Sequence, residues 1–163
     1  MLDTWQDLRV VRGSSALLVT SLPGKHAPQP LQAVMPPVMG SMLDLSDRGR
    51  RFRIYVTGDT LLHDRLREIP QRYPGIDLAL VHLAGTRVLG VLLPMDGDQG
   101  AEALEIVDPD AAIPIHYEEY TVMRSPLSDF DRAVAKRRLR TAIHSLERGD
   151  TFSFDLDARP GAT

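Results

Sequence analysis

The sequence predicts an α/β protein in which helices pack against a mixed sheet. Two observations lead to this prediction. Strand-like segments follow one another up to residue 57, and after residue 57 apolar strand segments alternate with segments of helical periodicity. A meander of strands that leads into alternating strand and helix is typical of helices packed on one mixed sheet. The 163 residues are enough for a single domain with its own core.

The first two predicted strands are residues 16–21 (ALLVTS) and 39–45 (MGSMLDL). A long loop, residues 22–38, joins them. Proline fixes φ and lacks a backbone N–H, so this loop cannot be a regular element, and long loops inside compact domains are often functional. Its prolines are Pro23, Pro28, Pro30, Pro36 and Pro37.

The next predicted strand is residues 52–57 (FRIYVT), which Gly58 ends. Residues 60–69 then favour a helix, because their apolar side chains recur at helical spacing. Residues 76–83 (IDLALVHL) form a nearly continuous apolar run, which is typical of a strand that is covered on both faces.

The rest of the chain continues the alternation and is expected to end in two short strands. Arginine, glycine and aspartate at residues 148–150 favour a turn between those strands. The predicted elements are a helix over 98–107, a strand over 111–115 (AAIPI), a helix over 128–139, and strands over 141–144 and 151–154.

The composition is that of an ordinary globular protein, with 43% hydrophobic residues, 25% charged residues and a formal net charge of −3. A chain without a basic excess is not expected to bind nucleic acid. The basic run at residues 136–140 (KRRLR) is interpreted as the solvated face of a helix. No apolar run approaches the roughly 20 residues that cross a bilayer, and the first residues lack a secretion-signal pattern. We therefore expect a cytoplasmic protein without membrane association.

The chain contains no cysteine. This excludes disulfides, thiolate metal ligands and a cysteine nucleophile. Any bound metal must therefore be held by histidine and carboxylate side chains, which suits hydrolytic zinc, manganese or iron sites.

Four ionisable side chains occur where a ligand site is expected in an α/β sheet. Asp59, His82 and His116 each lie at or near the end of a predicted strand, and His26 lies in the proline-rich loop. Ligand sites in such sheets form at the carboxyl ends of the strands. Each residue also has a structural interpretation, since Asp59 could cap the following helix and the histidines could be solvated or hydrogen-bonded loop residues.

Several segments taken together resemble the metallo-β-lactamase superfamily, and most closely its ascorbate-6-phosphate lactonase-like branch. The resemblance covers residues 5–130 and includes the metal-site motifs of that family. The matching segments are LPGKHAP, YVTGDT, PGIDLALVHLAGTR, PMDGDQGAEAL and IPIHYEEYTVMRSPLSDF.

The resemblance implies a divalent-metal hydrolase that uses zinc or manganese. His26 matches a ligand of the first metal, Asp59 the catalytic aspartate that bridges both metals, and His116 a ligand of the second. His82 and Arg87 match a stretch near the mouth of the substrate pocket. The implied reaction is attack of metal-activated water on a lactone, amide or phosphoester of a small-molecule substrate.

The sequence departs from the family in one respect, because no His-x-His-x-Asp-His segment occurs in it. We therefore expect residues 1–163 to form one partial domain, the C-terminal half of the αββα metallo-β-lactamase sandwich, with an exposed apolar sheet face. Three interpretations stay open. The chain is a truncated hydrolase that is inactive alone, one half of a split enzyme completed by another chain or a second copy, or a non-catalytic binding module.

Two other enzyme classes fit the sequence less well. The Gly-Asp of TGDT also occurs in haloacid-dehalogenase-type phosphatases, but those need an upstream Asp-x-Asp, and Asp108-Pro109-Asp110 lies downstream. No Gly-x-Ser-x-Gly elbow of a serine hydrolase is present. The two remaining histidines, His63 in the predicted surface helix and His144 near the end of the chain, are interpreted as structural.

Overall fold

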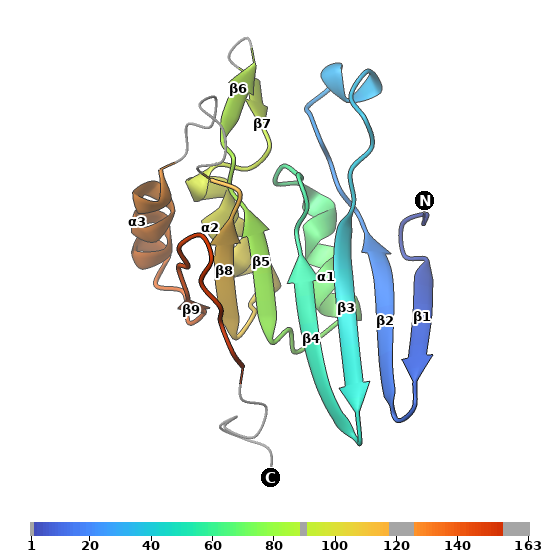
Figure 1. Ribbon diagram of the computed structural model, residues 1–163. Coiled ribbons are helices and arrows are strands. Elements are labelled where there is room, and N and C mark those ends of the chain that lie inside the picture. The colour runs from blue at the N-terminus through green and yellow to red at the C-terminus, as the bar shows by residue number, and fades with distance from the viewer. Residues whose placement is uncertain (1, 89–90, 118–125, 155–163) are drawn as a thin grey trace.

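The computed structural model describes residues 2–88, 91–117 and 126–154, and its main element is a mixed sheet (Figure 1). The strands lie in the order β1-β2-β3-β4-β5-β8-β9. β1 to β4 form an antiparallel meander, and β4, β5, β8 and β9 run parallel to one another. This arrangement confirms the predicted α/β class. The strands are β1 (Asp7–Arg12), β2 (Ser15–Leu22), β3 (Gly40–Asp47), β4 (Arg50–Val56), β5 (Leu78–His82), β8 (Ala111–Ile115) and β9 (Ala142–Ile143).

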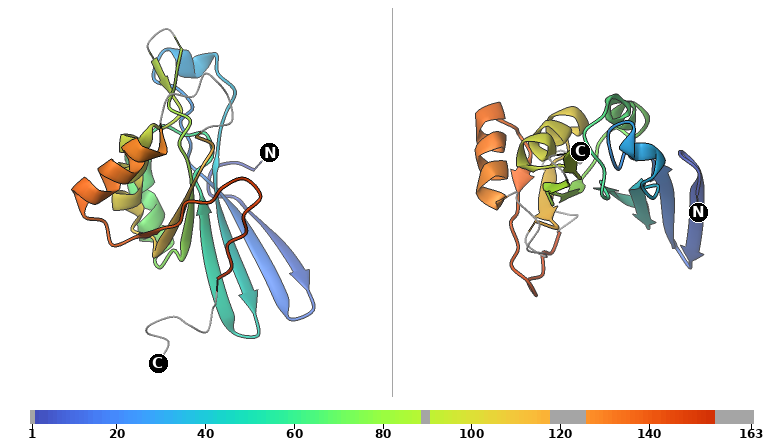
Figure 2. Two further views of the ribbon diagram at one scale, coloured as in Figure 1. Left: turned by 60° about the vertical axis from the view of Figure 1, so that its left-hand side comes forward. Right: turned by 90° about the horizontal axis from the view of Figure 1, so that it is seen from above.

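The helices α1 (Glu68–Arg72), α2 (Gly97–Val107) and α3 (Leu127–Arg137) all cover one face of this sheet (Figure 2). α2 presents small and apolar side chains to the strands, and its glycine at position 100 allows close approach. A Cβ at Gly100 would lie 2.2 Å from Cδ2 of Leu83. The main core lies between the helices and the sheet, and its largest buried side chains include Met42, Tyr55, Leu66, Ile69, Leu104 and Phe130.

Salt bridges at the surface join α3 to α2. Arg137 of α3 donates to the carboxylate of Asp98 at 2.9 Å, and it lies 3.8 Å from Glu102 and 3.5 Å from Glu105. Arg140, beyond the end of α3, pairs with Asp108 at 2.9 Å. Two of the basic side chains in the run 136–140 are therefore paired with acidic residues of the same domain.

The opposite face of the sheet is apolar and only partly covered. Over β5 and β8, residues after β9 pack on it, including Leu146 and Phe152. Over the meander it is open, because Leu8 is 55% exposed, Val10 52% and Leu45 40%. The cross-strand registers place these three side chains on the face that the helices do not cover. We refer to this part of the sheet as the open face.

The structure corrects the prediction of a helix over residues 60–69. A 3₁₀ helix, η2 (Asp64–Arg67), leads into the short helix α1, and the residues from Asp59 to His63 are not helical. The reason is tertiary. The backbone N–H of Lys25 donates to Oγ1 of Thr60 at 2.8 Å, and the N–H of Leu61 donates to the carbonyl of Lys25 at 2.7 Å. These bonds hold the segment against the proline-rich loop.

The structure also corrects the ends of the predicted meander and the end of the chain. The strand predicted over 151–154 is wrong, and the one predicted over 141–144 is reduced to β9. Strand β1 and the hairpin of β6 (Thr86–Val88) and β7 (Val91–Leu93) were not predicted. Both missed features pair locally at the edge of the fold or outside the sheet, where burial leaves a weak pattern in the sequence. No helix among residues 2–88, 91–117 and 126–154 is long and apolar enough to span a membrane.

Candidate metal centre

Three of the predicted site residues meet at one edge of the sheet. β4, β5 and β8 are adjacent and parallel, so that their carboxyl ends lie together at the upper edge in Figure 1. Asp59 follows β4, His82 is the last residue of β5, and His116 follows β8. The proline-rich loop and the β6–β7 hairpin both project beyond this same edge.

Asp59 and His116 form the best-defined pair of donor atoms. Oδ1 of Asp59 lies 3.9 Å from Nε2 of His116. Although the Asp59 side chain is 45% exposed, Oδ1 is buried and has no hydrogen-bond partner among the described residues. Two metal bonds of about 2.0–2.2 Å each would span this separation. The pair therefore fits a cation between its two atoms.

The backbone has a left-handed conformation at the residue before Asp59 and at His116 itself. Gly58, just before Asp59, has φ +64°, and His116 itself has φ +59°. Positive φ is uncommon for a residue with a Cβ, and such residues cluster at functional sites. At Gly58 the absence of a side chain is required, because a Cβ would lie 2.4 Å from the carbonyl oxygen of Met39.

His26 is oriented by a backbone carbonyl. Its Nδ1 lies 2.9 Å from the carbonyl oxygen of Pro36, at the other end of the same loop. A carbonyl oxygen can only accept, so Nδ1 carries the hydrogen, and in the neutral ring Nε2 has the lone pair. Histidines that bind metals are commonly held in this way. The bonds of Lys25 to Thr60 and Leu61 bring the backbone of His26 next to the Asp59 turn.

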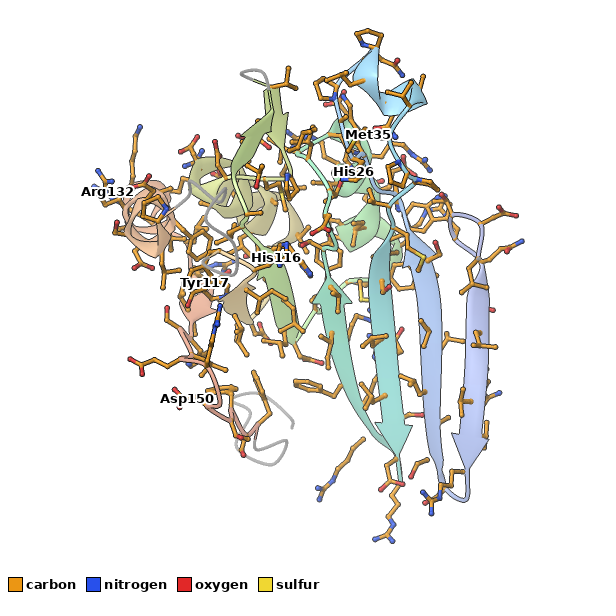
Figure 3. The ribbon with its side chains drawn as sticks, turned by 45° about the horizontal axis from the view of Figure 1, so that its top comes forward. His26, Met35, His116, Tyr117, Arg132 and Asp150 are labelled. Atoms are coloured by element: carbon orange, nitrogen blue, oxygen red, sulfur yellow. The ribbon has the colours of Figure 1, made fainter. Side chains whose placement is uncertain are left out.

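A hollow adjoins His116 on the side away from the helices. Tyr117 forms part of its wall, and the hydroxyl of Tyr117 donates to the carbonyl of Leu146 at 3.4 Å. Figure 3 shows Tyr117 beside His116, with Asp150 farther along the same side. The other lining residues include Ile113, Ile115, Leu146, Glu147 and Arg148.

The chain is similar in sequence to proteins named metal-dependent hydrolases. No family model matches the chain. It is 30% identical over 136 residues to a UPF0173 metal-dependent hydrolase of Thermofilum pendens, with 80% of this chain and 56% of the relative covered. It is 29% identical over 104 residues to one of Aeropyrum pernix, with 64% and 40% covered. The chain therefore spans about half the length of the curated relatives it matches.

Solved structures show the same fold. A metallo-hydrolase, Igni18, of the archaeon Ignicoccus hospitalis superposes with a TM-score of 0.64 at 23% identity, and 85% of this chain and 54% of that chain are covered. The metallo-β-lactamase fold protein YhfI of Bacillus subtilis superposes with a TM-score of 0.55 at 15% identity, with 90% and 52% covered. The chain has a metallo-β-lactamase fold. This confirms the fold that the resemblance predicted.

A third solved structure that superposes on this chain is an enzyme. An isothiocyanate hydrolase from gut bacteria of Delia radicum superposes with a TM-score of 0.69 at 15% identity, with 88% of this chain and 55% of that chain covered. At this identity the likeness shows the fold alone. The coverage again amounts to about half of the longer protein.

Within this metallo-β-lactamase fold the predicted site residues are only partly brought together. Asp59, His82 and His116 are neighbours, and the rings of His82 and His116 have centroids 5.7 Å apart. His26 and His116 lie apart in Figure 3, on the proline-rich loop and at the end of β8. The side chain of Arg87 lies outside the described part of the chain. Among the described residues, no three His, Asp or Glu side chains are grouped closely enough to hold a metal ion.

Two residues near the centre differ from what the sequence predicted. His63 is not in a surface helix but in the extended segment before η2, and its Nε2 is buried without a hydrogen-bond partner among the described residues. Burial lowers the pKa of His63, and the nearby charge of Lys25 acts in the same direction. Thr57 was not singled out, yet its hydroxyl is hydrogen-bonded to His82. Thr57 is the first residue of the TGDT motif, and this motif is the sequence signal that could have identified it.

Proposed function

We propose that this chain contributes metal donors to a hydrolytic centre of the metallo-β-lactamase type. Asp59 and His116 bind the cation, and His26 supplies a further nitrogen donor from the proline-rich loop. The single observation that carries the proposal is the buried Oδ1 of Asp59, which lacks a hydrogen-bond partner among the described residues and faces Nε2 of His116 at 3.9 Å. A buried carboxylate oxygen without a partner is costly unless a cation or a donor compensates for it.

A divalent cation bound at such a centre lowers the pKa of a coordinated water toward 7 and polarises the scissile group. The residues of this chain bind and orient. Asp59 presents its oxygen from the turn after β4, while Pro36 fixes the tautomer of His26. The hollow beside His116 and Tyr117 is where we place a small-molecule substrate. A lactone, amide or phosphoester is the substrate class, and zinc or manganese is the metal.

The full centre needs more donors than these residues supply. Catalytic zinc usually has three protein ligands and an open position. The chain covers about half of its relatives and of the solved structures, and the open face of the sheet exposes apolar side chains such as Leu8 and Val10. We propose that further elements of the fold pack on this face and complete the centre. A longer polypeptide, a complementing chain or a second copy would supply them.

Zinc and manganese titrations of the purified chain test the metal assignment. Isothermal titration calorimetry of Asp59→Ala and His116→Ala should show loss of whatever binding the parent protein has. The matched controls are His63→Ala and His144→Ala, which remove histidines that the proposal places outside the centre. The assignment is wrong if the control substitutions reduce the metal affinity as much as Asp59→Ala does.

A further inference from the structure

His116 has a backbone conformation that its surroundings must maintain. Its φ of +59° lies in the left-handed region, where a residue with a Cβ costs about 1–2 kcal/mol. Such residues persist when neighbouring contacts hold them in place. The strand pairing ends at the preceding residue, because the N–H of Leu83 donates to the carbonyl of Ile115 at 3.0 Å. Beyond that bond, the orientation of the His116 ring depends on side-chain contacts.

His82 provides one of these contacts. The rings of His82 and His116 have centroids 5.7 Å apart and planes tilted by 54°. This is within the range in which aromatic rings attract each other in tilted arrangements. His82 is the register partner of Ile115, so the two histidines project from adjacent strand ends. The position of the His82 ring therefore limits the space that the His116 ring can occupy.

Thr57 fixes the His82 ring in turn. Oγ1 of Thr57 accepts from the backbone N–H of His82 at 3.0 Å and lies 3.3 Å from its Nδ1. The hydroxyl has one hydrogen, and it donates this hydrogen to the carbonyl of Gly58 at 3.0 Å. Because the carbonyl of Gly58 is the nearer acceptor, we assign the hydroxyl hydrogen to it, so that Oγ1 accepts from the ring and Nδ1 of His82 carries a hydrogen. One buried hydroxyl thus ties the turn that carries Asp59 to the histidine that packs on His116.

We propose that Thr57 and His82 are positioning residues for His116. Thr57 holds the His82 ring as the Nδ1–H tautomer, and the His82 ring keeps Nε2 of His116 directed at Oδ1 of Asp59. The effect on metal affinity rests on the proposed function, whereas the effect on the His116 ring does not. Residues that orient metal-binding histidines without touching the metal change affinity about 10–100-fold when they are replaced.

The test compares Thr57→Val with Thr57→Ser in the full chain. Valine has the shape of threonine but cannot accept from Nδ1 of His82, whereas serine keeps the hydroxyl. In the metal-free protein, ¹⁵N NMR of the histidine rings should show His82 as the Nδ1–H tautomer in the parent and in Thr57→Ser. In Thr57→Val this tautomer should be lost, and the ring resonances of His116 should move with it.

The second readout is the affinity for Zn²⁺, measured by calorimetry. We expect Thr57→Val and His82→Ala to weaken the Zn²⁺ affinity about 10–100-fold. Thr57→Ser should keep the affinity of the parent. Thr141→Val is the control, because Thr141 is also buried and its hydroxyl donates to the carbonyl of Pro109 at 2.9 Å, near the opposite end of β8.

The two readouts separate this inference from the proposed function. If the parent chain alone binds no Zn²⁺, the donors it supplies do not suffice for binding without the rest of the centre, and the His116 resonances alone decide whether Thr57 and His82 position that ring. If those resonances and the Zn²⁺ affinity respond to Thr57→Val no more than to Thr141→Val, the positioning role is refuted. A Thr57→Val protein that is unfolded leaves His82→Ala as the deciding variant, with the same two readouts.

Discussion

Replacement of Gly58 by alanine would test how the turn that carries Asp59 is built. Gly58 has φ +64°, and a Cβ placed there would lie 2.4 Å from the carbonyl oxygen of Met39. The obstructing atom belongs to the backbone of the segment that leads into β3, so no side-chain rotation can relieve the overlap. Either the turn or the neighbouring segment must shift.

Two costs add in this variant. The left-handed conformation costs a residue with a Cβ about 1–2 kcal/mol. Relief of an overlap inside a packed region costs about 1–3 kcal/mol more. The sum of about 2–5 kcal/mol is a large part of the roughly 5–15 kcal/mol that stabilises a typical domain.

Gly75→Ala is the matched control for Gly58→Ala. Gly75 has φ +69°, and nothing lies within 4 Å of its virtual Cβ, so only the conformational cost applies. The loss of unfolded-state entropy on replacing glycine is similar in both variants and cancels in the difference. Urea unfolding can be followed by the fluorescence of Trp5, the one tryptophan of the chain, which stacks on Tyr73. A free energy of unfolding for Gly58→Ala equal to that of Gly75→Ala would refute the overlap with Met39.

Two further predictions concern pH and the contact between α3 and α2. Burial lowers the pKa of His63, so the folded protein binds a proton at this ring less tightly than the unfolded chain does. The stability is therefore full above the unfolded pKa of about 6.5. It falls as the pH drops from there through the lower pKa of the folded state. Urea unfolding at pH 7.5 and 5.5 should therefore show a smaller acid loss in His63→Gln than in the parent, and a loss in His144→Gln as large as in the parent; equal losses in all three proteins would contradict this. Arg137→Met should lower the free energy of unfolding by about 0.5–1 kcal/mol, because the carboxylates that it pairs with are largely exposed and solvent screens them. The hydrogen bond from Arg137 lowers the pKa of Asp98, so this stabilisation is present above the pKa that Asp98 has in the unfolded chain and is lost as the pH falls through its pKa in the folded protein. An Arg137→Met variant as stable as the parent at pH 7 would show that the pair contributes nothing.

The sequence predicted those elements whose pattern is set by burial along a short segment. The run AAIPI coincides with β8, and the helix predicted over 98–107 differs from α2 by one residue at its start. Strands buried on both faces and helices with one apolar face leave a periodic signal that does not depend on distant partners. The residue types of the candidate site were predictable for a similar reason, since the ends of adjacent parallel strands meet at one edge of a sheet.

The segment after Asp59 shows where this reasoning fails. Its apolar spacing favours a helix, yet the residues before η2 are not helical. The N–H of Lys25 donates to Oγ1 of Thr60, and the carbonyl of Lys25 accepts from the N–H of Leu61. A propensity of a few tenths of a kcal/mol per residue does not outweigh hydrogen bonds to a neighbouring loop. The partner in this case lies 35 residues earlier in the chain.

The amino-acid sequence by itself determined the α/β class, the exclusion of thiolate chemistry, and the choice of Asp59, His82 and His116 at the strand ends. The tertiary structure alone decided which donor atoms face each other, that His26 is held by Pro36 away from His116, and that Thr57 links the two sides of the centre. The physical reason is one of range. Periodicity and strand order follow from local burial, whereas contacts between single atoms depend on turns, left-handed residues and hydrogen bonds between segments that are distant in the chain.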